Sequence, residues 1–197
     1  MARVLVFALA VSHPSRFKTS DSLEYDRLAH HFHEAYVSSR QGPLFDLSLL
    51  RPPGYPALIA AVNALGGGAT AVIVVELLLS VATVGITYLL AAALFDRHIA
   101  TVAAFLLAID PISIAMSSNL TAETLFALLL VAAALLLVGR SRVLAVGAGL
   151  AIGLSVLVRP ISMYLPLVLV FTMPMLLRRR WVAVLIAAAI PIGAWMA

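Results

Sequence analysis

Ionisable side chains gather near the start of the chain, in the stretch DSLEYDRLAHHFHEAY that spans residues 21–36. This stretch carries five charged side chains and three histidines, and it is followed by long apolar runs. A positioned carboxylate can act as a general base, which typically contributes about 10²–10⁴ in rate. Arginine suits phosphate, because its guanidinium is always charged and can donate two parallel hydrogen bonds. Isolated carboxylates and arginines occur later in the chain, at Arg51, Asp110, Glu123 and Arg159.

The stretch 21–36 predicts an amphipathic helix that is suited to lie on a membrane surface. Its apolar and aromatic face would hold Tyr25, Leu28, Ala29, Phe32, Ala35 and Tyr36. Its charged face would hold Asp26, Arg27, His30, His33 and Glu34. Thr19, Ser20 and Asp21 are all good N-caps, and Asp21 has capping-box spacing to Glu24. A simpler interpretation is that Asp21 only caps this helix while Glu24 and Asp26 face water.

The three histidines of this stretch, His30, His31 and His33, raise the question of a metal site. Adjacent residues of a helix point about 100° apart, and the three positions include no i,i+4 pair. We therefore predict that these histidines do not form a metal site.

The composition indicates an integral membrane protein. Hydrophobic residues make up 63% of the 197 residues and charged residues only 11%, against about 25% charged in soluble domains. The mean hydropathy is +1.08. The apolar stretches are continuous runs, so helices are expected and a β-barrel is not. Basic residues form short clusters between these runs, which favours membrane topology over nucleic-acid binding. The absence of cysteine excludes disulfides and thiol chemistry.

The apolar runs predict an all-α fold, a polytopic transmembrane helical bundle, because about 20 apolar residues suffice for one crossing. The predicted membrane helices are 69–95, 98–117 with a break at Asp110, 121–138, 143–158, 161–177 and 181–197. Residues 1–12 are interpreted as an incomplete first helix, and 13–66 as an outer loop with helices beside the membrane. We expect the chain to be the N-terminal part of one transmembrane domain in a longer protein.

The positive-inside rule orients the predicted helices. The basic clusters at residues 97–98, 140–142 and 178–180 are placed in the cytoplasm. The long loop 13–55, the turn that starts at Asp110, and Arg159 then lie outside. The candidate carboxylates and arginines are therefore expected to converge on the extracytoplasmic side of the cell membrane, with the apolar helices as their scaffold.

A rigid turn follows the charged stretch, in the sequence RPPGYP at residues 51–56. The two consecutive prolines disfavour helix, the glycine permits a tight turn, and Pro56 suits the first position of a helix. The helix expected at 56–65 is too short to cross a membrane. This turn would hold Arg51 and Tyr55 against the outer ends of the membrane helices.

Four motifs in order resemble one family of membrane enzymes. They are DSLEYDRLA from Asp21, RPPGYP from Arg51, SSNLTAETLFALLL at 117–130 and GLSVLVRPISMYLPLVLV at 153–170. Together they resemble the GT-C superfamily of glycosyltransferases, and more narrowly the bacterial proteins similar to dolichyl-phosphate-mannose protein mannosyltransferases. The RPPGYP turn is the most specific of the four motifs, which together cover most of residues 20–170.

The resemblance implies transfer of a hexose or pentose from a polyprenyl-phosphate carrier to an acceptor glycan, lipid or protein outside the membrane. Asp21 matches the position of the family's catalytic aspartate. The expected substrate-binding residues are Tyr25, Arg51, Tyr55, Glu76, Asp110, Glu123 and Arg159. No cofactor is expected to be required, although some members of the superfamily use a divalent cation. Family members are longer, so the 197-residue chain alone is expected to be inactive.

Each later candidate also has a simpler explanation. Asp110 can serve only to shape a turn, and Glu123 can favour the macrodipole in the first turn of a helix. Arg159 can extend its charge to the lipid headgroups. Glu76 lies about seven residues into a membrane helix, roughly 10 Å deep at 1.5 Å per residue. A carboxylate there costs up to about 3 kcal/mol, so Glu76 should face the bundle or a cavity.

Two other kinds of function fit a membrane protein of this composition, a transporter or lipid flippase and a non-catalytic assembly subunit. A transporter concentrates its polar residues near the middle of the membrane, on broken helices. Here every candidate except Glu76 is expected at the outer interface, which favours the glycosyltransferase.

Overall fold

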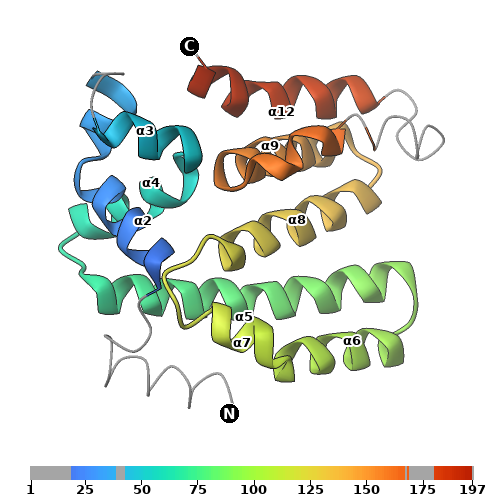
Figure 1. Ribbon diagram of the computed structural model, residues 1–197. Helices are drawn as coiled ribbons and strands as arrows, with labels where there is room; N and C mark the ends of the chain where they lie inside the picture. Colours follow the sequence, from blue (N-terminus) through green and yellow to red (C-terminus); the bar gives the residue numbers. More distant parts are fainter. Residues whose placement is uncertain (1–18, 39–42, 167, 169–179, 197) are drawn as a thin grey trace. The chain divides into compact units, whose positions relative to one another are not determined.

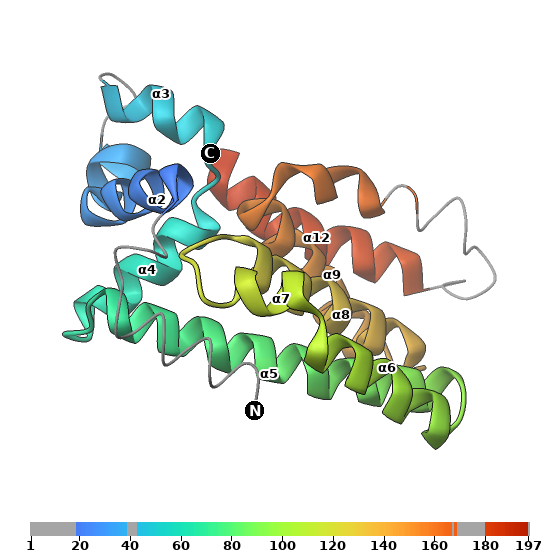
Figure 2. The same cartoon turned by 60° about the horizontal axis from the view of Figure 1, so that its bottom comes forward.

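The computed structural model describes residues 19–38, 43–166, 168 and 180–196, which form helices joined by short turns (Figures 1 and 2). No strand occurs among these described residues, so the predicted all-α fold is confirmed. The chain divides into two compact units. The first unit comprises residues 1–82 and 105–125, and the second unit comprises residues 83–104 and 126–197.

Helix α2 (Ser20–His30) carries the charged stretch in the first unit. Its buried side chains include Tyr25, Leu28 and Ala29, all on the face predicted to be apolar. The helix ends at His30 with His31 as its C-cap, and a π-helical segment, Glu34–Ser38, follows. The amphipathic character predicted for 21–36 is therefore confirmed, although the stretch is not one continuous α-helix.

The rigid turn leads from α3 (Pro43–Leu50) into α4 (Gly54–Ala64). Pro52 and Pro53 are buried, and Pro53 is the N-cap of α4, so this helix begins two residues before the predicted Pro56. Helix α4 packs against α2 and is followed by Gly66, whose φ of +80° suits a residue without a side chain. The packing of α4 on α2 brings the turn beside the charged stretch.

Helix α5 (Ala69–Leu94) has 26 residues and is long and apolar enough to cross a membrane. It alone passes that test within the part of the chain that the structure describes. Only 28% of its most apolar window is buried, and Leu78, Val81 and Leu89 are exposed. The core helix of a soluble protein would be mostly buried, so this exposure fits a surface that faces lipid.

Shorter apolar helices follow at positions close to the predicted ones. They are α6 (Arg97–Ile109), α8 (Glu123–Val138), α9 (Arg142–Val158) and α12 (Trp181–Met196). The break predicted at Asp110 separates α6 from α7 (Pro111–Met116). Only the start of the predicted helix 161–177 is described, where Pro160–Tyr164 is a 3-10 helix, while 1–12 lies outside the described residues. The number of membrane crossings stays a prediction.

The second unit is built on close packing of α9 against α12, which lie side by side (Figure 1). A Cβ atom on Gly149 would lie 2.4 Å from the carbonyl oxygen of Val184, and one on Gly153 would lie 2.4 Å from that of Ala188. Only glycine permits such an approach of two backbones. The buried core around this contact consists of Ala133, Leu137, Ala145, Ala148, Ala151, Ile152, Val184 and Ala188.

Candidate functional site

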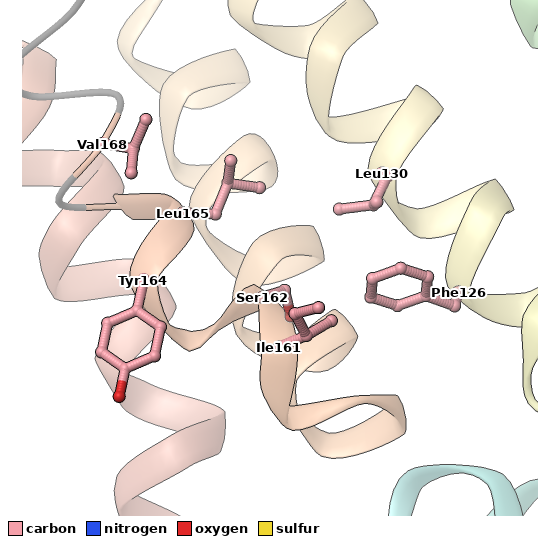
Figure 3. Close-up of a pocket in the computed structure, with 7 residues that line it drawn as sticks. All are labelled: Phe126, Leu130, Ile161, Ser162, Tyr164, Leu165 and Val168. Carbon is pink, nitrogen blue, oxygen red and sulfur yellow. The ribbon is translucent and has the colours of Figure 1, made fainter.

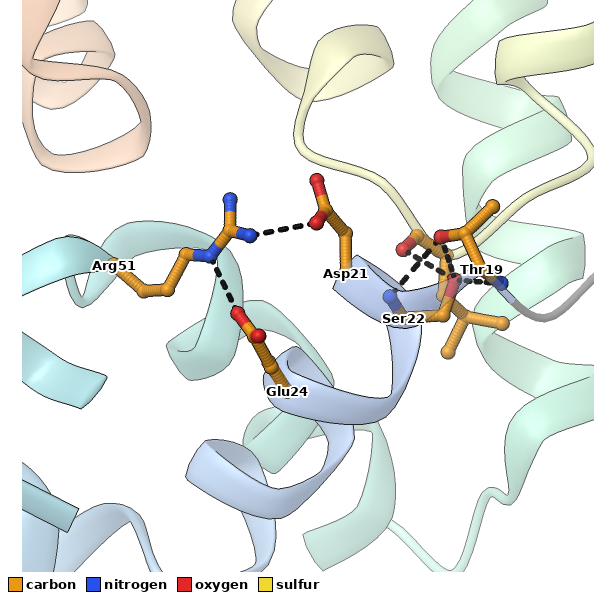
Figure 4. Close-up of polar contacts among 6 residues, drawn as sticks. Thr19, Asp21, Ser22, Glu24 and Arg51 are labelled. Atoms are coloured by element: carbon orange, nitrogen blue, oxygen red, sulfur yellow. Dashed lines mark hydrogen bonds and ion pairs between the residues drawn. The ribbon is translucent and has the colours of Figure 1, made fainter. Parts of the chain in front are cut away.

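Arg51 joins two carboxylates of α2 in the first unit (Figure 4). Its Nη2 donates to Oδ1 of Asp21 at 2.6 Å, and its Nε donates to Oε2 of Glu24 at 3.0 Å. The side chain of Arg51 is 25% exposed, whereas that of Asp21 is 46% exposed. We call Asp21, Glu24 and Arg51 the ionic cluster. It carries one positive and two negative charges and is open to solvent on the side of Asp21.

The start of α2 fixes the position of Asp21. Thr19 is the N-cap, and it forms a reciprocal capping box with Ser22, each side chain accepting from the other's backbone N–H at 3.2 Å. Ser22 is buried, and its hydroxyl also donates to the carbonyl of Leu120 at 3.1 Å. The interpretation of Asp21 as a cap is therefore wrong, because Thr19 already fills that position. Asp21 lies in the first helical turn, where a carboxylate is favoured by the macrodipole.

The backbone and ring contacts of Arg51 fix the other half of the cluster. The hydroxyl of Tyr36 donates to the carbonyl of Arg51 at 2.7 Å. The guanidinium lies over the ring of Tyr25, 5.1 Å from its centroid. Tyr25 in turn meets Tyr55 edge to face, with the ring centroids 4.8 Å apart and the planes at 78°. The predicted turn thus holds Arg51 through aromatic contacts with α2 and α4.

The pKa values in this region follow from burial and from the cluster's charges. Burial alone would lower the pKa of Arg51, but the hydrogen bond to Glu24 and the charge of Asp21 outweigh it, so the pKa is raised. Burial raises the pKa of the Tyr25 hydroxyl, and the charge of Arg51 opposes that rise. The charges of Glu123 and Asp21 add to the rise. The carboxylates of Asp21 and Glu123 thus both act on the hydroxyl of Tyr25.

A second layer of polar groups lies beneath the aromatic rings. Tyr55 and Glu76 are both 0% exposed, and Thr124 is 7% exposed. Burial raises the pKa of the Tyr55 hydroxyl strongly, and the nearby carboxyl of Glu76 adds to that rise. Tyr55 and Glu76 therefore lie inside the first unit, and the expectation that they bind substrate stays a prediction.

The remaining predicted site residues lie elsewhere. Asp110 is the N-cap of α7, where its Oδ2 accepts from the backbone N–H of Ser113 at 2.6 Å, as the simpler explanation expected. Arg159 belongs to the second unit, where it ends α9 and lies 6.0 Å from the ring centroid of Phe126. The structure thus brings together six predicted residues of the first unit: Asp21, Tyr25, Arg51, Tyr55, Glu76 and Glu123.

Some contacts of the site were not predicted from the sequence. The simpler interpretation had Glu24 facing water, whereas the structure pairs its partly exposed side chain with Arg51. The three-residue spacing from Asp21 to Glu24, which puts both on one side of a helix, was the available signal. Asp26 does lie at the surface, 3.6 Å from His30. No group of three His, Cys, Asp or Glu side chains suited to a metal occurs among the described residues.

The second unit contains a pocket of about 260 Å³ beside the 3-10 helix (Figure 3). Its lining is mostly apolar and consists of Phe126, Leu130, Ile161, Ser162, Tyr164, Leu165 and Val168. Ser162 is the buried polar residue of this wall, and its hydroxyl is paired with that of Ser155 at 2.9 Å. The pocket therefore offers apolar surface, with Arg159 near Phe126 as the nearby cation.

Comparison with known proteins identifies a family. Residues 50–196 match the sequence model described as dolichyl-phosphate-mannose-protein mannosyltransferase. This range covers most of the chain and includes Arg51 and Arg159, but it begins after Asp21. A search of curated proteins and a search of solved structures each found no match.

Proposed function

The chain belongs to the dolichyl-phosphate-mannose-protein mannosyltransferase family, and from this we propose that it transfers a sugar from a polyprenyl-phosphate-linked donor to an extracytoplasmic acceptor. Membership makes the chain a membrane glycosyltransferase and confirms the resemblance seen in its motifs. The proposal goes beyond family membership in naming the donor, the acceptor and the outer location of the site.

The reaction needs a base and a cation close together. A hydroxyl group of the acceptor attacks the anomeric carbon, and the bond from that carbon to the phosphate oxygen breaks. The hydroxyl proton passes to Asp21, and the lipid phosphate leaves with the electron pair of the broken bond. Arg51 stabilises the negative charge on the leaving phosphate. Asp21 later returns the proton to water, so the enzyme ends as it began.

The ionic cluster is the observation that carries this proposal. Arg51 engages its two carboxylates through Nε and Nη2. An arginine guanidinium has more N–H donors than these two bonds use, so it can also donate to an incoming phosphate. A phosphate bound to Arg51 competes with Asp21 for the guanidinium, so donor binding would release the carboxylate to act as a base. The 46% exposure of Asp21 lets an acceptor hydroxyl reach it.

The cluster also suggests how the site functions without a metal ion. Arg51 neutralises part of the negative charge of Asp21 and Glu24, which is the role a divalent cation plays beside paired carboxylates. We therefore expect sugar transfer to continue in the presence of a chelator, and loss of activity on chelation that is restored by Mg²⁺ or Mn²⁺ would contradict this.

Replacement of Asp21 by asparagine tests the proposed base. The full-length protein would be assayed with a panel of polyprenyl-phosphate-linked hexoses and pentoses. Asp21→Asn should lower kcat by about 10²–10⁴, because asparagine cannot accept the proton. Donor affinity should be kept, because Arg51 is unchanged. Stability should fall by at most about 1 kcal/mol, the usual value for a partly exposed ion pair.

Asp26→Asn is the matched control, since Asp26 lies on the same helix and has no contact with Arg51 among the interactions above. Its turnover should stay within about 3-fold of wild type, as expected for a surface substitution. Near-normal transfer by Asp21→Asn would remove Asp21 from the reaction. Carriage of labelled lipid across vesicles without any sugar transfer would instead favour the transporter or flippase.

A further inference from the structure

A buried polar cluster underlies the ionic cluster in the first unit. Its members are Tyr55 of α4, Glu76 of α5 and Thr124 of α8. The hydroxyls of Tyr55 and Thr124 both interact with the carboxyl of Glu76. Three helices from separate parts of the sequence thus meet at one carboxyl group.

The polar atoms of this cluster lack good hydrogen bonds. The Tyr55 hydroxyl, both carboxyl oxygens of Glu76 and the Thr124 hydroxyl are buried without a partner in hydrogen-bonding geometry among the described residues. A buried polar group left in this state destabilises the fold, and more so where it carries charge. An apolar side chain at position 76 would avoid that cost. The stability of α5 therefore does not explain why a glutamate occupies position 76.

The cluster is linked to Arg51 through two aromatic rings. Tyr55 meets Tyr25 edge to face at 4.8 Å, and Tyr25 lies beneath the guanidinium of Arg51 at 5.1 Å. A shift of the Tyr55 ring can therefore be passed to the Tyr25 ring through this contact. The Tyr25 ring in turn limits where the guanidinium can lie relative to Asp21.

We propose that Glu76 is a positioning residue for the ionic cluster, acting through the hydroxyl of Tyr55. The carboxyl of Glu76, together with Thr124, holds that hydroxyl at a fixed depth between α4, α5 and α8. Tyr25 and Arg51 are thereby aligned with Asp21. Glu76 is fully buried, so it acts without touching the sugar or the lipid. This inference rests on the proposed function, because alignment of Arg51 matters for the transfer reaction.

A double-mutant cycle in the full-length protein tests the link between Glu76 and Tyr55. Tyr55→Phe keeps the ring contact with Tyr25 but removes the hydroxyl. Tyr55→Phe and Glu76→Ala should each lower kcat about 10-fold, and the double variant should be no worse than the worse single variant, because both remove one interaction. Glu76→Gln should stay within about 3-fold of wild type, since an amide can still hydrogen-bond the hydroxyl.

Ile73→Ala is the matched control for a purely structural effect. Ile73 is 1% exposed and lies three residues before Glu76 on α5. The cavity should lower the melting temperature at least as much as Glu76→Ala does. Its kcat per folded molecule should be unchanged, because an isoleucine side chain has no polar atom that could hold the hydroxyl of Tyr55.

The outcomes separate this inference from the function on which it rests. An active wild type in which the two losses multiply, to about 100-fold in the double variant, would overturn the positioning role alone. Full activity of Tyr55→Phe, or an equal kcat loss in Ile73→Ala, would also overturn it. A wild type that transfers no sugar from any donor of the panel would overturn the proposed function, and the positioning role with it.

Discussion

The helices inside each of the two units pack through different kinds of contact. In the second unit, α9 and α12 approach so closely that a single added carbon on Gly149 or Gly153 would overlap the facing backbone. In the first unit, helices meet through aromatic rings, an arginine shared by two carboxylates, and a buried glutamate without a good hydrogen-bond partner. The second unit is packed for stability, whereas the first unit retains polar groups that reduce it.

This difference indicates where function is concentrated. Close packing of small residues contributes to stability in a membrane, where helices gain little from burying apolar surface. Polar groups that cost free energy persist mainly where they bind, react or position something. The comparison therefore predicts that substitutions in the α9–α12 contact change stability, whereas substitutions around Arg51 change turnover.

Gly153→Ala should give the largest stability effect. The added Cβ would lie 2.4 Å from the carbonyl oxygen of Ala188, which is backbone and cannot move aside without shifting α12. Overpacking of this kind typically costs about 1–3 kcal/mol. The melting temperature of the protein in detergent should fall accordingly, while kcat per folded molecule should be unchanged.

Gly147→Ala on the same helix is the control for Gly153→Ala. Its Cβ would lie 3.4 Å from Cδ1 of Leu136, an ordinary contact with a flexible side chain. Alanine is favoured over glycine within a helix by about 0.5–1 kcal/mol, so this variant should be neutral or stabilised. Equal destabilisation at the two positions, or a specific loss of kcat in Gly153→Ala, would remove the distinction between the units.

The helices were predictable from the sequence because long apolar runs leave few alternatives. The predicted 69–95 became Ala69–Leu94, and the predicted 143–158 became Arg142–Val158. The break at Asp110 was also predictable, because proline follows it. The identity of the helix cap was not predictable, since Thr19, Ser20 and Asp21 are all suitable caps and only the structure shows that Thr19 pairs with Ser22.

The candidate site could be predicted only in part. The apolar face of α2 follows from its spacing, and it places Tyr25 correctly. The pairing of Arg51 with Asp21 and Glu24 joins residues that are 30 and 27 positions apart, so it depends on how α2 and α4 pack. No local pattern encodes that contact, so the sequence did not show that Glu24 pairs with Arg51.

Arg159→Ala tests whether a residue of the second unit contributes to donor binding, in addition to the unit's role in stability. The sequence predicts that Arg159 holds the donor phosphate. A hydrogen bond to a charged group contributes about 1.5–3 kcal/mol, so loss of Arg159 should weaken donor affinity about 10-fold or more. Arg159→Lys should recover only part of this, because lysine lacks the planar fork of arginine. Donor affinity is measured by competition with geranyl phosphate in detergent.

Ile161→Ala provides the control for Arg159→Ala. Ile161 lies in the 3-10 helix that follows Arg159, lines the pocket and is 77% exposed, but it carries no charge. Its donor affinity should be close to that of wild type. Unchanged donor affinity in Arg159→Ala would mean that Arg159 only places its charge at the lipid headgroups. The second unit would then serve as a scaffold.

Glu24→Gln should have the smallest effect of these substitutions, and it should raise donor affinity where Arg159→Ala lowers it. Glu24 and Asp21 share Arg51, so the ionic cluster carries a net charge of −1 before an anionic donor arrives. Removal of the Glu24 charge weakens the competition for Arg51 and reduces repulsion of the phosphate. A partly exposed ion pair is worth about 0–1 kcal/mol, so donor affinity should rise by no more than about 5-fold. Turnover should be nearly unchanged, because the proposed base is Asp21.

The same change from carboxylate to amide at Asp21 should instead abolish most of the turnover. A loss of kcat in Glu24→Gln as large as that in Asp21→Asn would show that the two carboxylates share one role, and a single base could then no longer be assigned to Asp21.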